Sequence, residues 1–385
     1  MIDKKREYSR DYGGLTYMKR RYTSQLVGCL LGKLVLVALV VSQKMQGAQA
    51  LQEFLVKTEK TGWVHEYQHI FSDEELRMYR YAREFLSEQV LTPDFTQLIF
   101  SWNGYRHKKG HFVFSVGVQD RQTGMWDWHT LVEWGVEKQR SFFSRGKYSV
   151  FKYARLEMND GRVGSAFQIK VEAFDALSLD QLKGLFVVTS NFTVFNPETS
   201  KEVYNLGLPS YKVLQATPKS QIRIDHPRAN ALCSPTSMAM VVQALKKEPI
   251  DELAFANHVY DAGLDVFGNW AFNMAHAFEY FHDDASDTRM YFYATRLNSF
   301  KDLYSLLVRK TPIAVSVRGV LRGAFKSYNN GHLLVVIGWD AARKKVICFD
   351  PRFETETEVE REYDLADFLL AWERSHRLTY KFIRV

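Results

Sequence analysis

The sequence predicts an α+β protein in which an N-terminal antiparallel β-sandwich, of jelly-roll kind, precedes a second domain that begins with helices and ends with a sheet. Between about Asp94 and Asn196, apolar and polar residues alternate along short stretches that Gly, Asp and Asn turns separate. After Cys233, apolar residues recur at spacings of three, four and seven. A chain of 385 residues, 46% of them hydrophobic, is long enough to build both cores.

Residues 1–50 have the succession of a signal peptide or signal anchor. A basic triplet at residues 19–21 precedes an apolar run at residues 34–41, and an Ala-Gln-Ala cleavage site occupies residues 48–50. The run is short for a membrane span, and Lys33 belongs to the same segment. We therefore expect export to the periplasm or the medium, with a membrane-anchored protein as the alternative.

A net charge of +7 would be compatible with nucleic-acid binding, but the positions of the charges argue against it. Residues 1–50 hold nine Lys and Arg against three Asp and Glu, so the rest of the chain carries a net charge of only +1. Because the basic character belongs to the leader, we expect no nucleic-acid partner, and membrane contact only through an uncleaved leader.

Residues 51–93 are predicted to form a helical lead-in, because residues 72–75 are a capping-box pattern that an apolar helical stripe follows. Residues 94–200 are predicted to form the β-sandwich, and residues 201–219 a connector to the domain at residues 220–385. The sandwich contains four tryptophans that we expect to fill its core rather than to bind a ligand: Trp102, Trp126, Trp128 and Trp134. The last domain is predicted to contain helices at residues 251–262, 271–281 and 298–308 and strands at residues 313–317 and 378–385.

Cys233 is placed at the start of an amphipathic helix. Pro235 is suited to the first helical turn, so Ser234 or Cys233 would be the N-cap, with the thiol beside the positive end of the helix. That end favours the thiolate, which is the nucleophilic form of cysteine. The alternative is a small buried cysteine at a helix start.

A hairpin near the end of the chain places a histidine and an aspartate together. If its turn is centred on Ala341, His332 lies directly opposite Asp350, close enough for a hydrogen bond. A carboxylate that orients a histidine, which in turn activates a thiol, is the logic of a catalytic triad. The alternative is a His and an Asp that only cap strand ends. None of the other histidines starts an apolar strand with a matched Asp, and no Cys/His set has zinc spacing, so we expect no metal and no cofactor.

The order of these residues resembles that of papain-like cysteine peptidases, and in particular the exported relatives of the bacteriocin-processing (double-glycine leader) peptidases of bacteria. Five motifs carry the resemblance: Ser220-Gln221, residues 233–237 (Cys-Ser-Pro-Thr-Ser), Gly268-Asn269-Trp270, Gly331-His332-Leu333 and Asp350-Pro351. The resemblance implies that Cys233 is the nucleophile, His332 the base and Asp350 its orienting carboxylate, and that Gln221 and the Cys233 N–H stabilise the oxyanion. Two departures are Ser234, where the transporter-linked members have glycine, and the twelve residues between Gln221 and Cys233.

The sequence therefore predicts an exported cysteine peptidase that cleaves a peptide or protein substrate through a thioester acyl-enzyme. Asn269 and Trp270 are candidates for substrate binding, and either is also an alternative oxyanion donor. The alternative function is a catalytically silent protein, an amidase or an acyl transferase that binds a cell-wall or peptide ligand.

Overall fold

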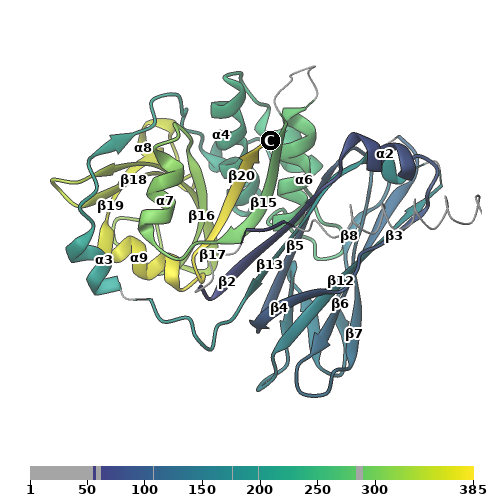
Figure 1. The fold of residues 1–385 in the computed structure, drawn as a ribbon. Helices are drawn as coiled ribbons and strands as arrows, with labels where there is room; N and C mark the ends of the chain where they lie inside the picture. The colour runs from purple at the N-terminus through teal and green to yellow at the C-terminus, as the bar shows by residue number, and fades with distance from the viewer. Residues whose placement is uncertain (1–54, 58–61, 107, 176, 198, 283–288) are drawn as a thin grey trace, which may run out of the picture. The chain divides into compact units, whose positions relative to one another are not determined.

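The computed structural model describes residues 55–57, 62–106, 108–175, 177–197, 199–282 and 289–385 (Figure 1). Helices and antiparallel sheets both occur, which confirms the α+β class. The predicted leader lies outside the described residues, so its role stays a prediction. Within the described ranges, no helix is both long and apolar enough to span a membrane.

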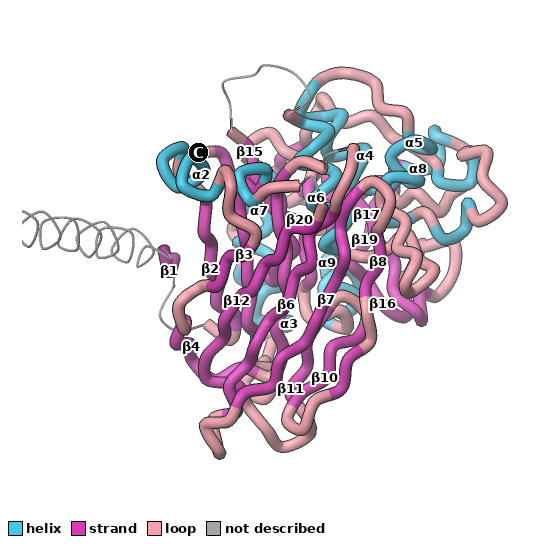
Figure 2. The backbone as a smooth tube through the Cα atoms, turned by 90° about the vertical axis from the view of Figure 1, so that its right-hand side faces the viewer, coloured by secondary structure: helices cyan, strands magenta, loops and turns pink. Residues whose placement is uncertain are grey.

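The N-terminal part contains two antiparallel sheets, whose long strands Figure 2 shows side by side. Aromatic rings from the two sheets contact each other: the centroids of Tyr67 and Phe167 are 5.2 Å apart, and those of Trp102 and Phe114 are 4.5 Å apart. The jelly-roll class stays a prediction. In spatial order the first sheet contains β1 (Leu55–Lys57), β2 (Val64–Ile70), β13 (Leu182–Ser190), β5 (Gln97–Gly104), β11 (Arg155–Met158), β10 (Ser149–Lys152) and β9 (Ser144–Arg145). The second contains β3 (Glu84–Leu86), β12 (Gly164–Phe174), β6 (His111–Asp120), β7 (Trp126–Gly135) and β8 (Gln139–Ser141), with β4 (Val90–Phe95) paired to β12.

The helical interpretation of residues 51–93 is wrong for most of the described part. The capping box does start a helix, α2 (Asp73–Tyr79), in which the Ser72 side chain accepts from the Glu75 N–H. The flanking segments are the strands β2, β3 and β4. Side-chain burial along β2 alternates from Glu66 onward, which is the period of a strand and not of a helix.

Two of the four tryptophans fill the core, as predicted, and two do not. Trp102 and Trp134 are fully buried, and their rings meet edge to face at 5.5 Å. Trp128 is 44% exposed, and the Trp126 ring stacks on it at 6.4 Å. The Trp128 ring lies over Gly117, its cross-strand partner, where a Cβ would come within 2.6 Å of the ring.

The C-terminal part is built on one antiparallel sheet with helices around it (Figure 1). The last strand, β20, lies inside this sheet and not at its edge. In spatial order the sheet contains β15 (Met290–Arg296), β20 (Leu378–Arg384), β16 (Ile313–Gly319), β17 (Tyr328–Asp340), β18 (Lys345–Phe349) and β19 (Glu360–Asp364), with β14 (Tyr211–Lys212) paired to β17. The helices are α3 (Thr199–Asn205), α4 (Cys233–Lys246), α5 (Glu252–His258), α6 (Trp270–Phe281), α7 (Phe300–Leu307), α8 (Glu356–Val359) and α9 (Leu365–Glu373).

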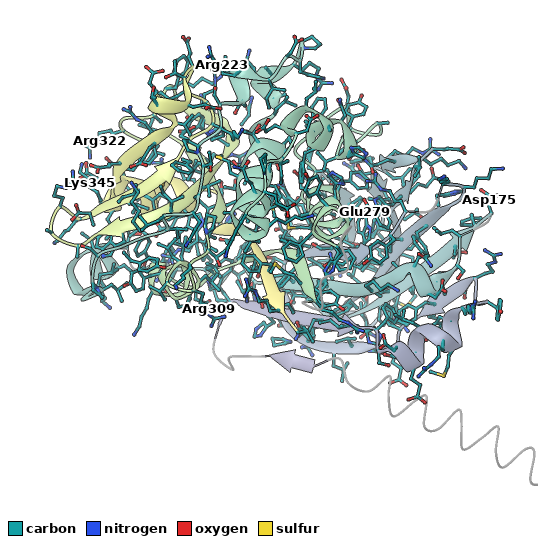
Figure 3. All side chains as sticks on the ribbon, turned by 90° about the horizontal axis from the view of Figure 1, so that it is seen from above. Asp175, Arg223, Glu279, Arg309, Arg322 and Lys345 are labelled. Atoms are coloured by element: carbon teal, nitrogen blue, oxygen red, sulfur yellow. The ribbon has the colours of Figure 1, made fainter. Side chains whose placement is uncertain are left out.

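Strand β5 joins the first sheet to the C-terminal part. The Asn103 side chain donates to the Phe292 carbonyl at 2.8 Å and accepts from the Phe292 N–H at 2.7 Å, so β5 is tied to the edge strand β15. Arg106, just after β5, forms an ion pair at 2.5 Å with Glu279 of α6, which Figure 3 labels. These polar contacts are buried or half-buried and fix the first sheet beside the helix that follows the Gly-Asn-Trp loop.

Candidate active site

Cys233 is the first residue of α4, so the helix begins earlier than predicted. Leu232 is the N-cap, and Pro235 stands at the third helical position. Proline is tolerated there because the first N–H groups of a helix have no intrahelical acceptor. For the same reason the Cys233 N–H has no acceptor within the helix. Ser234 does not cap the helix, because its hydroxyl bonds to the Tyr380 hydroxyl at 2.8 Å.

His332 lies in β17 and is bonded to Asp350 just beyond β18, with 2.7 Å between Nε2 and Oδ1. The predicted direct opposition is nevertheless wrong. Cys348 pairs with Val336 and not with Leu334, so the register is shifted by two residues. Extension of this ladder places Asp350 diagonal to His332 on the same face, because residues two apart in a strand share a face.

Asp350 is fully buried and accepts from four donors. Besides His332, the Arg352 N–H donates to Oδ1 at 3.1 Å, and the hydroxyls of Tyr328 and Tyr363 each donate to Oδ2 at 2.7 Å. The Tyr328 ring also stacks on the imidazole, with 4.0 Å between centroids. Burial opposes ionisation of Asp350, but the charge of His332 and these hydrogen bonds hold its pKa below the ordinary value.

The thiol and the imidazole shift each other's ionisation. Burial acts to raise the pKa of Cys233, but a hydrogen bond and the charge from His332, together with a hydrogen bond from the Leu333 backbone, lower it overall. Burial acts to lower the pKa of His332, but Asp350 and then Cys233 raise it to about 9. Since Nε2 is bonded to Asp350, Nδ1 is the nitrogen left for the thiol. Both shifts act in favour of the thiolate–imidazolium pair over the thiol and the neutral imidazole.

The other described cysteine, Cys348, has no hydrogen bond or charge from His332, and its pKa is shifted in the opposite direction. It is fully buried, and burial followed by the nearby charge of Asp350 raises its pKa well above the ordinary value. The site thus contains one activated cysteine, while the other described cysteine is a packing residue of the core.

The Ser-Gln motif is attached to the Asp-Pro motif. The Gln221 N–H donates to the Pro351 carbonyl at 2.9 Å, and the Ser220 hydroxyl donates to the Phe353 carbonyl. The Gln221 side chain is fully buried; its Nε2 donates to the Ala229 carbonyl at 2.8 Å, and its Oε1 has no partner among the described residues. A primary amide has a second N–H donor, but Gln221 is not among the residues that line the cleft beside Cys233, so its role as an oxyanion donor stays a prediction.

The two candidate residues of the Gly-Asn-Trp loop, Asn269 and Trp270, have different surroundings. Asn269 caps α6 by accepting from the Ala271 N–H, and its amide donates to Asp261 at 2.7 Å, so its side chain is occupied within the fold. Trp270 lines the cleft described next, with the Arg155 guanidinium 6.0 Å from its ring centroid. Trp270 therefore remains a candidate for substrate contact, whereas the structure gives Asn269 a local role.

Cys233 and His332 open onto a cleft of about 910 Å³. Its walls come from the loop before α4, the starts of β17 and α6, and residues of β5 and β11 in the first sheet. Within the part of the chain that the structure describes, no three His, Cys, Asp or Glu side chains are arranged to hold a metal ion. The sequence patterns identified neither Tyr328 nor Tyr363 as a residue of the site, although both donate to Asp350.

Comparison with known proteins supports this view of the C-terminal part. Residues 213–380 match the model of the Peptidase_C39 like family, which supports a cysteine-type peptidase. No curated protein and no solved structure matches the chain. The matched range contains Gln221, Cys233, His332 and Asp350, and it begins after the last strand of the two N-terminal sheets.

Proposed function

We propose that the protein is an exported cysteine peptidase that hydrolyses peptide bonds through Cys233, His332 and Asp350. The observation that carries the proposal is the chain of contacts from buried Asp350 through His332 to a thiol at a helix N-terminus, in a cleft. The first of the two N-terminal sheets, which together are interpreted as a β-sandwich, supplies one wall of that cleft through β5 and β11.

The reaction follows from the ionisation states. Cys233 Sγ attacks the peptide carbonyl, and the tetrahedral oxyanion accepts from the Cys233 N–H and from Gln221. The imidazolium of His332 then protonates the leaving amine as the C–N bond breaks, which leaves a thioester on Cys233. His332 next takes a proton from water, whose oxygen attacks the thioester; the acid leaves, and the thiolate–imidazolium pair returns.

Alkylation with iodoacetamide tests the thiol directly. We expect the wild-type protein to be labelled at Cys233 at neutral pH faster than glutathione, and His332→Ala to lose this advantage. Cys348→Ala is the matched control and should label as wild type. Incubation with a proteome-derived peptide library, read by mass spectrometry, should give new termini that Cys233→Ala does not give.

The outcomes separate the candidate functions. Fast labelling without new peptide termini would favour the amidase or acyl transferase, because these share the acyl-enzyme. Labelling no faster than that of glutathione would favour the silent binding protein. Export is tested separately by the mature N-terminus, which we expect to follow Ala50; a full-length protein in the membrane fraction would favour the anchor.

A further inference from the structure

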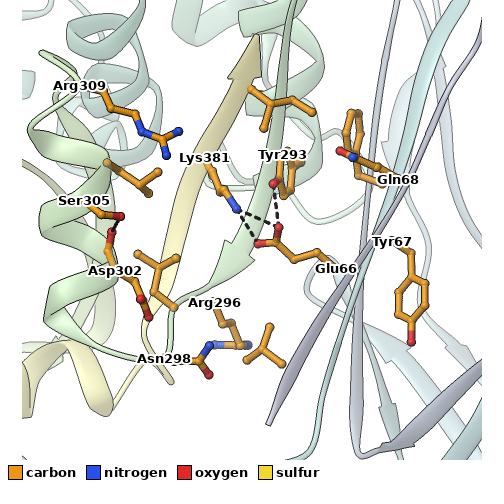
Figure 4. A pocket seen from close by; sticks show the side chains of 15 residues that line it. Glu66, Tyr67, Gln68, Tyr293, Arg296, Asn298, Asp302, Ser305, Arg309 and Lys381 are labelled. Carbon is orange, nitrogen blue, oxygen red and sulfur yellow. Dashed lines mark hydrogen bonds and ion pairs between the residues drawn. The ribbon is translucent and has the colours of Figure 1, made fainter. Parts of the chain in front are cut away.

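The cleft beside Cys233 has a strongly unbalanced set of charges. Seven cationic side chains line it against the single carboxylate of Glu157: Arg155, Arg228, Arg296, Arg318, Lys326, Arg352 and Arg374. Residues 51–385 carry a net charge of only +1, so this excess is local. The neighbouring pocket in Figure 4 is different, because Glu66 there pairs with Lys381 at 2.9 Å and accepts from the Tyr293 hydroxyl.

Most of the cleft cations have no carboxylate partner. Arg155 is paired with Glu157 at 2.6 Å and Arg228 with Asp265. The other five form no ion pair with any described residue. The Arg374 guanidinium donates to the Val320 carbonyl at 3.1 Å, and its side chain lies against Gly319, next to Arg318 in the chain.

Arg296 is the member for which the absence of a counter-ion matters most. It is 4% exposed, and its guanidinium is held by neutral acceptors: the Ser375 and His376 carbonyls at 2.8 Å and the Gln97 side chain at 2.5 Å. Its Nε has no partner among the described residues. Burial and then the charge of Arg155 lower its pKa to about 9, although Glu157 acts to raise it. A buried cation without a counter-ion is costly, and an anion in the cleft would remove that cost.

His376 lies at the same end of the cleft as Arg296. Its ring stacks on Phe192 at 3.9 Å, and both residues line the cleft. Burial, followed by the charges of Arg296, Arg155 and Arg318, lowers the pKa of His376 to about 4. The imidazole is therefore neutral at pH 7, and the arginines supply the charge at this end of the cleft.

We propose that Arg155, Arg296, Arg318 and Arg374, the arginine cluster, form a specificity site that binds a carboxylate of the peptide substrate. The proposal rests on the proposed function, since it concerns the substrate of the same cleft. Guanidinium groups match carboxylates through paired N–H donors, and a peptide offers a carboxylate either on an Asp or Glu side chain or at its C-terminus.

Matched alkylating peptides test the proposal without knowledge of the natural substrate. The probes are iodoacetyl-Gly-Glu-amide, iodoacetyl-Gly-Gln-amide and iodoacetyl-Gly-Gln with a free terminal carboxylate, each also made with longer glycine spacers. In every case the Cys233 thiolate displaces iodide and forms a thioether. We expect at least one carboxylate probe to react about tenfold faster than its neutral partner, and this preference to weaken at high ionic strength. Preference for the Glu probe identifies a side-chain carboxylate, and preference for the free acid identifies the chain end.

Variants assign the preference to the cluster. Arg318 is exposed and unpaired, so Arg318→Gln should fold and lower the preference about two- to fivefold, and Arg296→Gln should lower it further. Arg309→Gln is the matched control, because Arg309 is exposed and lines the other pocket (Figures 3 and 4). Equal rates for charged and neutral probes at every spacer length would overturn the proposal, as would a preference that Arg318→Gln and Arg374→Gln both retain in full. Iodoacetamide separates the two failures: slow labelling by this neutral reagent contradicts the peptidase itself, and fast labelling without charge preference contradicts only the arginine cluster.

Discussion

Two of the buried histidines that lie beside a carboxylate, His332 and His276, have pKa shifts in opposite directions. His332 beside Asp350 has its pKa raised to about 9, whereas His276 beside Glu279 has its pKa lowered to about 4. Burial acts in the same direction on both rings. The neighbours differ: the charge of Arg106, which also pairs with Glu279, acts to lower the pKa of His276, whereas Asp350 and then Cys233 raise that of His332. A histidine–carboxylate contact therefore predicts a charged imidazole only where no cation competes for the carboxylate.

The largest expected effect is on catalysis. Cys233→Ala and His332→Ala should each lower kcat by about 10⁵-fold or more, and their combination should be no worse, because the two residues act as one unit. His276→Gln should stay within about twofold of the wild-type rate, since its ring is neutral and lies outside the cleft. Assays on a peptide found in the library experiment measure all three. A Cys233→Ala enzyme with wild-type activity would refute the peptidase.

Asp350→Asn removes the charge that distinguishes the two histidines. We expect a loss of about 10⁴-fold in kcat with the fold retained, because the side chain is nearly isosteric. The pH profile should change as well. Wild-type activity should fall as the pH rises through about 9, where His332 loses its proton, and this fall should move to lower pH in the residual activity of Asp350→Asn. An unchanged alkaline fall would show that Asp350 does not set the ionisation of His332.

Gln221→Ala tests the oxyanion assignment. Loss of one oxyanion donor typically costs about 10²- to 10³-fold in kcat, and we expect a value in this range. A wild-type rate would instead leave the Cys233 N–H with another donor, of which the Trp270 Nε1 is the candidate that lines the cleft.

The sequence could indicate which residues come together in the site, but not the register of the hairpin that brings His332 and Asp350 together. A Cys at a helix start and a His before an apolar strand are local patterns, and the structure does place Cys233, His332 and Asp350 together. The hairpin turn is centred between Ala342 and Arg343 and not on Ala341, because Asp340 pairs with Lys345. A bulge near Gly338 then changes the pairing further along. A shift of two residues keeps every side chain on its face, which is why the contact between His332 and Asp350 survives the error.

Local sequence patterns could not indicate the tyrosine hydroxyls that donate to Asp350. Tyr363 lies in β19, and its approach to Asp350 depends on the pairing of β19 with β18, which no local pattern indicates. The arginine cluster is similar: Arg155 belongs to the first sheet and Arg374 follows α9, so the charges converge only in the fold. The sequence did show the near-neutral charge of residues 51–385, against which the local excess is measured.

The smallest expected effect is on the free energy of unfolding. It compares the Tyr363 hydroxyl, which donates to a carboxylate, with the Tyr304 hydroxyl, which donates to a neutral carbonyl. Tyr363→Phe removes a donor to the buried Asp350 carboxylate, and we expect the free energy of unfolding at pH 7 to fall by about 1–3 kcal/mol. The pKa of Asp350 is lowered in the folded protein, so its ionised form contributes stability above its unfolded pKa, and this contribution is lost as the pH falls through the folded value.

The difference between wild type and Tyr363→Phe should therefore shrink as the pH is lowered towards and below 3.8, the ordinary pKa of Asp. Tyr304→Phe is the matched control, because the Tyr304 hydroxyl donates to the neutral Pro209 carbonyl, so its effect should not depend on pH in this range. Urea unfolding of the three proteins between about pH 7 and pH 3 measures both differences. A pH-independent cost of Tyr363→Phe would mean that its hydroxyl only fills space beside Asp350, and that the remaining donors, His332, Tyr328 and the Arg352 N–H, keep the carboxylate ionised without it.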